Sequence, residues 1–345
     1  MFLILLVVLV YIAIHLTPVQ NWIVKKVADN LSKKLQTKVS VKHVNFSLFN
    51  KMELVGVMVE DRKADTLLYA GKVNVSVTDW FFLRDKATLH YIGLRDAVVN
   101  MNRIDSVWNY QFLVDYFSSP KKDTLAKDGG LEFDFKKIEL SNIRFNQSDK
   151  WTGKDFIAYL KTGSIDANVI DFSKKHIEIN AVKLDEPFFA QLDYPGKRIS
   201  EPASTTIPVN AVASKPSGWH MSLKALDITN GTFKNEKQTE RLPYTDRFDG
   251  QHLLFSSINA GFRDLTFAND SLVSSLIISA KEKSGIEIKS LKANAKMNSV
   301  MMEFSDLDLV TNNSRIGDYY AMRYTDFDED MSSFLHNVTI EAKLK

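Results

Sequence analysis

The feature that most constrains this chain is an apolar side chain at every second position, from Val39 almost to the last residue. Such alternation gives a β-strand one apolar face and one polar face. The clearest runs lie at 39–41, 73–77, 133–135, 165–169, 177–181, 221–225, 286–288, 302–304 and 338–344. Helical patterns interrupt them only at 79–84 and 108–118. We therefore predict a mostly β fold whose strands pair antiparallel, because crossover helices are almost lacking.

Composition narrows the possible functions. Of the 345 residues, 45% are hydrophobic and 25% are charged, which excludes a largely disordered chain. The net charge of +2 gives no reason to expect a nucleic-acid partner. The absence of cysteine excludes disulfide scaffolds, cysteine zinc sites and thiol nucleophiles. Polar stretches near 118–130, 194–218 and 234–250 are expected to be loops or insertions within one β domain over 38–345.

The first 17 residues depart from this pattern. Residues 1–14 are uniformly apolar and uncharged, and as a helix they would span about 21 Å. A signal-peptide core, a transmembrane anchor and a buried helix are the alternatives. A cleaved signal needs a basic start and a small-x-small cleavage site, which are missing here. We therefore predict a transmembrane anchor over 1–17.

Residues 18–37 follow as a second predicted helix, with apolar side chains at every fourth position from Val19 to Leu35. This helix could cap one end of the sheet, which we favour, or lie in a membrane interface. In the membrane interface, Trp22, Lys25 and Lys26 would be the residues at the level of the lipid headgroups.

A loose repeat recurs along the predicted strands, in which apolar alternation meets an Asn or Asp. Examples occur at 94–100, 140–146, 226–233 and 304–313. Because Asn and Asp accept left-handed backbone and often form turns, we expect them to end one strand and start the next. Repeated addition of such hairpins would give an elongated, curled antiparallel sheet, a groove or taco-like trough.

Sequence motifs give no sign of catalysis. The seven histidines are scattered without a zinc spacing, and no nucleophile elbow, phosphate loop or dinucleotide fingerprint is present. The acidic cluster at 326–330 lacks the spacing of a calcium loop and is interpreted as a solvated turn. We therefore expect a non-enzymatic protein with no catalytic residue, metal or cofactor.

Several segments resemble a known family. Residues 19–22, 31–41, 43–50, 54–61, 65–71 and 78–82 are similar, in this order, to the start of TamB-type proteins of the AsmA-like superfamily, in their Bacteroidota form. Residues 106–113 resemble the Trp-Asn-x-x-x-Leu element of that superfamily, and 307–318 resemble one of its strand-turn-strand passages. Members are much longer, so the resemblance implies that this chain is an N-terminal fragment.

The resemblance implies a single-pass inner-membrane protein with a periplasmic β body. It also implies relatives among the bridge-like lipid transfer proteins, which conduct phospholipids toward the outer membrane through an apolar groove. The alternative that it implies is a scaffold that assembles outer-membrane proteins with a BamA-like barrel partner. Lys25, Lys26, Lys33 and Lys34 lie just after the predicted anchor and would favour a cytoplasmic body. A basic stretch missing before Met1 would reconcile these two topologies.

We expect the apolar sides of the strands to line the groove and to shelter acyl chains. The expected lining residues are Val73, Val75, Val77, Leu89, Tyr91, Phe133, Phe135, Ile165, Val169, Ile177, Ile179, Ile286 and Ile288. Alternation alone does not distinguish this groove from a closed β-sandwich, as in an adhesin-like surface domain, in which these side chains would pack on one another.

Overall fold

The computed structural model describes residues 17–47, 51–77, 86–118, 130–171, 174–198, 218–239, 246–325 and 337–344. In these residues the helices are α2 (Thr17–Leu35) and α3 (Gln111–Ser118). The strands are β1 (Val39–Ser40), β2 (His43–Ser47), β3 (Lys51–Glu60), β4 (Thr66–Val77), β5 (Lys86–Arg103), β6 (Gly130–Asp149), β7 (Lys154–Asp171), β8 (His176–Asp193), β9 (His220–Lys237), β10 (His252–Ala268), β11 (Ser271–Glu282), β12 (Glu287–Met297), β13 (Met301–Thr311), β14 (Arg315–Arg323) and β15 (Thr339–Leu344). The prediction of a mostly β fold is confirmed.

The strands form one open sheet in which almost every strand pairs with its neighbours in sequence. The order runs β1-β3-β4 and then consecutively to β15, and β2 also pairs with β3. The expectation of a purely antiparallel sheet is wrong at one place, because β5 and β6 are parallel. A parallel pair needs a crossover of a dozen or more residues. The connection over 104–129, which contains α3, is long enough to return the chain to the edge where β5 began.

None of the described helices is long and apolar enough to cross a membrane. The anchor predicted over 1–17 falls outside the described residues, apart from Thr17 at the start of α2. The helix predicted at 79–84 and the acidic cluster at 326–330 also lie outside them.

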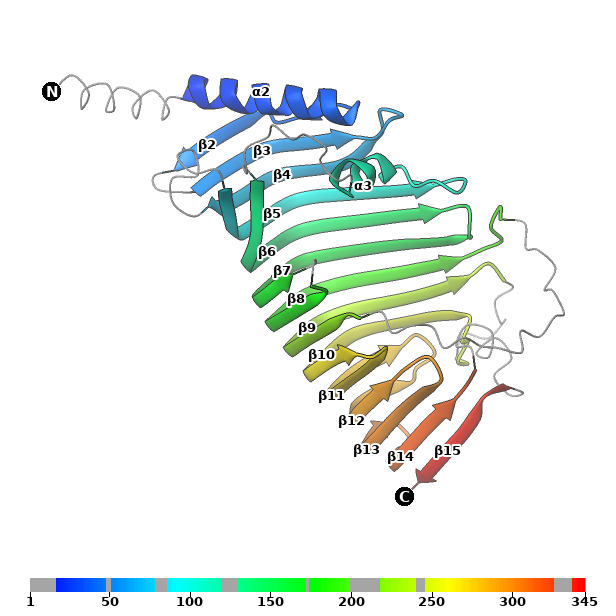
Figure 1. Cartoon of the computed structure of the whole chain (residues 1–345). Coiled ribbons are helices and arrows are strands. Elements are labelled where there is room, and N and C mark those ends of the chain that lie inside the picture. The colour runs from blue at the N-terminus through cyan, green and yellow to red at the C-terminus, as the bar shows by residue number, and fades with distance from the viewer. Residues whose placement is uncertain are drawn as a thin grey trace. The chain divides into compact units, whose positions relative to one another are not determined.

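The chain divides into two compact units. Unit 1 comprises Met1–Thr162 and Leu192–Arg198, and unit 2 comprises Gly163–Gln191 and Ile199–Lys345. Both described helices belong to unit 1, where α2 lies along β1 and β2 (Figure 1). Ala28 and Leu35 of α2 are buried in one cluster with Val39 of β1, Leu67 of β4 and Phe112 of α3. The helices therefore cover one end of this unit's sheet.

Hydrogen bonds between turns hold the crossover of unit 1 in place. The Arg103 guanidinium donates to both carboxylate oxygens of Asp149, with Nε 2.8 Å from Oδ1. The same guanidinium lies 4.5 Å from the centre of the Trp108 ring. Asn109 donates to the Asp61 carboxylate at 3.1 Å. These contacts join the turn after β3, the end of β5 and the end of β6.

The next turn along the same edge is joined in a similar way. Tyr194 donates its hydroxyl hydrogen to Asp155 at 2.8 Å, and burial together with this bond raises the pKa of Tyr194 to about 12. The Tyr194 amide donates to the Gly153 carbonyl at 2.8 Å. A Cβ at Gly153 would lie 1.8 Å from the Tyr194 carbonyl oxygen, so only glycine fits there. These bonds explain why residues 192–198 belong to unit 1.

The expectation that the Asn and Asp positions of the repeat form turns is confirmed at Asn312 and Asn313, which lie in the turn between β13 and β14, and is wrong at the left-handed position of each example. Asp96, Asn142, Asn230 and Asp306 all lie inside continuous strands, with φ between 49° and 53°. Asp96 and Asn142 stand at one level of the paired β5 and β6, and the Asn142 amide donates to the Asp96 carboxylate at 2.5 Å. Left-handed backbone within a strand bends it and changes which face the following side chains meet.

The change of face is visible around Asp306 in unit 2. Phe304 and Leu309 both pack against the cluster that contains buried Leu307. In regular alternation Phe304 and Leu307 would point to opposite faces. Asp306 lies between them, where the pairing of β13 with β14 shifts its register. The bulge thus keeps apolar residues on one face although their spacing in sequence changes from two to three.

The left-handed backbone at Asp306 generates a stability prediction. Asp306→Val should lower the free energy of unfolding by about 1–2 kcal/mol, because a β-branched residue is strained at this φ. Asp306→Asn should change it by less than about 0.5 kcal/mol, since Asn accepts the conformation and keeps an oxygen for Asn294. Urea unfolding followed by circular dichroism measures both. Equal effects of the two substitutions would contradict the bulge as the cause.

The Arg103–Asp149 pair generates a pH prediction. The hydrogen bonds from Arg103 lower the pKa of Asp149 from 3.8 to about 2, equivalent to about 2 kcal/mol of stability. This contribution is present above pH 4 and is lost as the pH falls toward 2. Asp149→Asn should remove it at neutral pH and flatten the acid dependence. Urea midpoints between pH 2 and 6 test this, with exposed Asp105→Asn as the control.

Candidate functional site: apolar sheet faces and a slot beneath α2

Unit 1 carries an apolar face built from directly opposed residues on four neighbouring strands. Val73 of β4 stands between Leu54 of β3 and Leu94 of β5. Val75 occupies the same position between Met52 and Ile92. The parallel strand β6 continues the two rows with Leu140 and Ile138. Residues directly opposite one another share a face, so the structure brings Val73 and Val75 together as predicted lining residues.

Tyr91 lies on the other face of unit 1. Its hydroxyl donates to the Glu139 carboxylate at 2.7 Å, and burial together with this bond raises the pKa of Tyr91. Glu139 also pairs with Lys137 at 2.7 Å. The structure therefore does not bring Tyr91 to the apolar face. Four further predicted lining residues sit on β4, β5 and β6 but have side chains outside the described part: Val77, Leu89, Phe133 and Phe135.

In unit 2, the predicted lining residues of β7 and β8 share a face. Asn168 donates to Glu178 at 2.8 Å and Asn180 donates to Asp166 at 3.4 Å, so these even-numbered residues meet on one side. Alternation then places the odd-numbered apolar residues of both strands on the other side. These residues, all half-buried, are Ile165, Val169, Ile177 and Ile179.

An apolar cluster of unit 2 extends over β10 to β14. Its buried centre consists of Leu276, Ala293, Ala295 and Leu307. Larger side chains surround this centre and remain only partly buried: Phe262, Ile278, Leu291, Phe304, Leu309, Ile316 and Tyr320. Predicted Ile288 stands opposite Ala280 and joins this face. Predicted Ile286 does not, because it lies in the turn before β12 and is 38% exposed.

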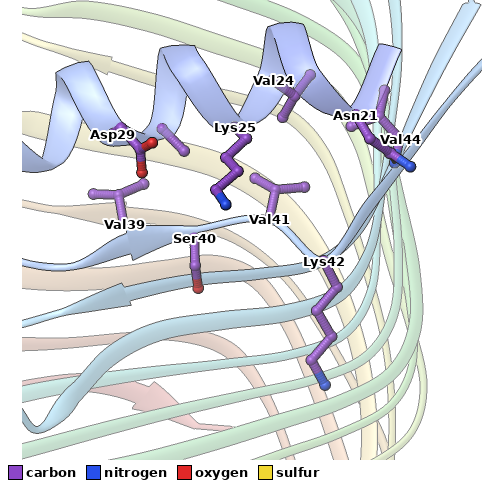
Figure 2. A pocket seen from close by; sticks show the side chains of 10 residues that line it. Asn21, Val24, Lys25, Asp29, Val39, Ser40, Val41, Lys42 and Val44 are labelled. Atoms are coloured by element: carbon purple, nitrogen blue, oxygen red, sulfur yellow. Dashed lines mark hydrogen bonds between the residues drawn. The ribbon is translucent and has the colours of Figure 1, made fainter. Parts of the chain in front are cut away.

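A separate cavity lies in unit 1 between α2 and the strands β1 and β2. It has a volume of about 250 Å³. Val24, Lys25, Ala28 and Asp29 line it from the helix, and Val39, Val41 and Val44 are among the residues below (Figure 2). We call this cavity the α2 slot. Half of its ten lining residues are aliphatic, and Lys25, Asp29 and Lys42 are the charged ones.

Two polar contacts fasten α2 on either side of the α2 slot. Near its start, Asn21 accepts a hydrogen bond from the Val44 amide at 3.0 Å. Toward its end, the Ser32 hydroxyl accepts from the Val39 amide at 2.9 Å. These anchors are about 16 Å apart along a helix, so α2 is held to the sheet at two points with the slot between them.

The predicted membrane-interface residues separate into two groups. Trp22 is 62% exposed, and the Lys26 ammonium lies 5.2 Å from the centre of its ring. Lys25 instead lines the α2 slot. Trp22 and Lys26 therefore form an exposed aromatic and basic pair, and Lys25 has different surroundings.

Sequence reasoning missed Leu54, Ile92, Leu94 and most of the β10–β14 cluster, although these residues alternate as clearly as the chosen ones. Matching apolar runs on consecutive strands would have identified them.

The sequence matches no known protein-family model, and no match was found among curated proteins.

The two anchors of α2 generate a prediction. Asn21→Ala with Ser32→Ala should increase hydrogen exchange of the α2 amides about tenfold or more, because each lost hydrogen bond contributes about 1 kcal/mol to holding the helix. Mass spectrometry of deuterium uptake measures it. Exposed Asn30→Ala, on the same helix, is the control. Unchanged exchange in the double variant would show that apolar packing alone holds α2.

Proposed function

We propose that this chain is a non-enzymatic, inner-membrane-anchored protein whose periplasmic β portion conducts phospholipids toward the outer membrane on its apolar sheet faces. The observation that most supports this function is that the apolar cluster over β10 to β14 in unit 2 is only partly buried. Around four buried residues, seven larger apolar side chains keep part of their surface accessible. An apolar surface of this kind can accept a fatty acyl chain.

The energetics of lipid transfer favour such a surface. An acyl chain of sixteen carbons exposed to water costs roughly 12 kcal/mol at about 0.8 kcal/mol per methylene. Contact with apolar side chains on successive strands recovers much of that cost. Neighbouring strands are about 4.8 Å apart, so each strand extends the apolar surface by a few methylene lengths. Moving a lipid along it changes no covalent bond and needs no catalytic group.

The compartment and the direction of transfer come from the resemblance to TamB-type proteins of the AsmA-like superfamily. The resemblance also supplies the BamA-like barrel as an expected partner. The exposed pair of Trp22 and Lys26 on α2 supports contact with a membrane surface, since tryptophan and lysine are enriched where headgroups meet water. Because α2 starts at Thr17, three residues after the apolar run of 1–14, the two would reach the membrane together.

Adjacent residues on β11 provide a matched test. Ile278 packs in the apolar cluster, whereas Ile277 is 56% exposed on the opposite face. Ile278→Asp should lower the amount of bound phospholipid about tenfold or more, because an acyl chain on this face would remove water from the carboxylate without offering it a hydrogen bond. Ile277→Asp should leave it unchanged. Lipid bound to the purified full chain is counted by mass spectrometry, and circular dichroism verifies folding.

The absence of cysteine allows a second readout without a disruptive charge. A single cysteine at Leu309 carries a polarity-sensitive fluorophore on the apolar face, and one at Lys292 carries it on the other. Phospholipid should shift the emission only at position 309. Equal responses at both positions, or none, would overturn the proposal. If unfolded outer-membrane protein binds without lipid, and a proline in an edge strand weakens that binding, the result would favour the scaffold.

A further inference from the structure

The α2 slot is fixed in size by the contacts at its two sides. Asn21 and Ser32 hold α2 to β2 and β1, and buried Ala28 and Val39 bring the helix close to the sheet. Between these contacts about 250 Å³ stays open. Typical sites for drug-sized ligands measure about 300–1,000 Å³. The slot is therefore suited to a small polar group with a short apolar part, and too small for a whole lipid.

Two exposed residues of opposite charge on α2 border this space. Figure 2 shows the side chains of Lys25 and Asp29 directed from α2 toward β1. They are four positions apart, so their Cβ atoms are about 6 Å from each other on one face of the helix. Neither forms an ion pair with a residue in the described part of the chain. Lys42 also lines the slot, but its side chain points away from α2.

A ligand that satisfies both charges must carry an anion and a cation a few ångströms apart. Phosphate next to a primary ammonium, as in a phosphoethanolamine group, has this arrangement. Its phosphate oxygens can accept from the Lys25 ammonium, and its ammonium can donate to the Asp29 carboxylate. Val24, Val39 and Val41 would contact the methylene groups. A phosphoglycerol group offers only the anion, and a phosphocholine group has no N–H to donate.

We propose that the α2 slot binds a zwitterionic phosphoethanolamine headgroup between Lys25 and Asp29. This inference rests on the proposed function and specifies the lipid class that enters the protein beside α2. It assigns the slot to recognition of the headgroup, while the apolar faces hold the acyl chains.

The experiment is a calorimetric titration of the full chain, kept in dodecyl maltoside, with short-chain lipids. Dihexanoyl phosphatidylethanolamine should bind about tenfold tighter than the phosphatidylglycerol and phosphatidylcholine analogues. Lys25→Gln and Asp29→Asn should each remove this preference. Lys33→Gln on the same helix and Asp65→Asn in an exposed turn are charge-matched controls that should retain it. Free phosphoethanolamine, as a separate titrant, distinguishes a soluble ligand from a lipid headgroup.

Equal affinity for all three lipids in the unchanged chain would overturn the inference. So would a preference for phosphatidylethanolamine that survives Asp29→Asn, since the Asp29 carboxylate would then not be the group that selects the ammonium. Tighter binding of free phosphoethanolamine than of the lipid would assign the slot to a soluble ligand and overturn the lipid headgroup. Ile278→Asp separates the two proposals. If it abolishes lipid binding while Lys25→Gln has no effect, the lipid function stands and the headgroup assignment fails. If neither substitution affects lipid binding, both fail.

Discussion

A sheet built by adding strand after strand must keep its apolar side chains on one face, and that requirement shapes much of this protein. Long strands twist and bend, so strict alternation over 18 residues cannot by itself keep the two faces distinct. Left-handed residues inside the strands solve this problem. At Asp306 the backbone takes up one extra residue, and the apolar set continues on the same side. Asn and Asp suit these positions because their short polar side chains accept that conformation.

Asn and Asp residues also stabilise unit 1, but through an ion pair and side-chain hydrogen bonds. Where β5 and β6 run parallel, no hairpin joins the two strands, and the paired charges of Arg103 and Asp149 join the last residues of both strands instead. Asp61 and Asn109 attach the same connection to the turn after β3. Polar contacts of this kind hold the end of the unit where α2 and α3 pack. The α2 slot therefore lies in a part of unit 1 that these polar contacts stabilise.

Much of this fold follows from the sequence, since alternation from Val39 onward predicts strands whatever their partners. The parallel pair could not be predicted, because strand direction depends on where the connection over 104–129 leads. Tyr91 was assigned to the wrong side, since alternation alone does not identify which of two neighbouring residues shares a face with Val75. The α2 slot depends on the register of a helix over two strands. Hydrogen bonds of Asn21 and Ser32 set that register, and no periodicity reveals them.

The pairing of each strand with its sequence neighbours has an evolutionary consequence. In unit 2 a hairpin such as β11 and β12 contacts β10 on one side and β13 on the other. Duplicating or deleting one hairpin would disturb only its pairing with the strand on each side and would leave distant strands intact. Each such event would change the width of the sheet by about 10 Å. Selection could thus change the width of the sheet in steps of one hairpin, without redesigning a core.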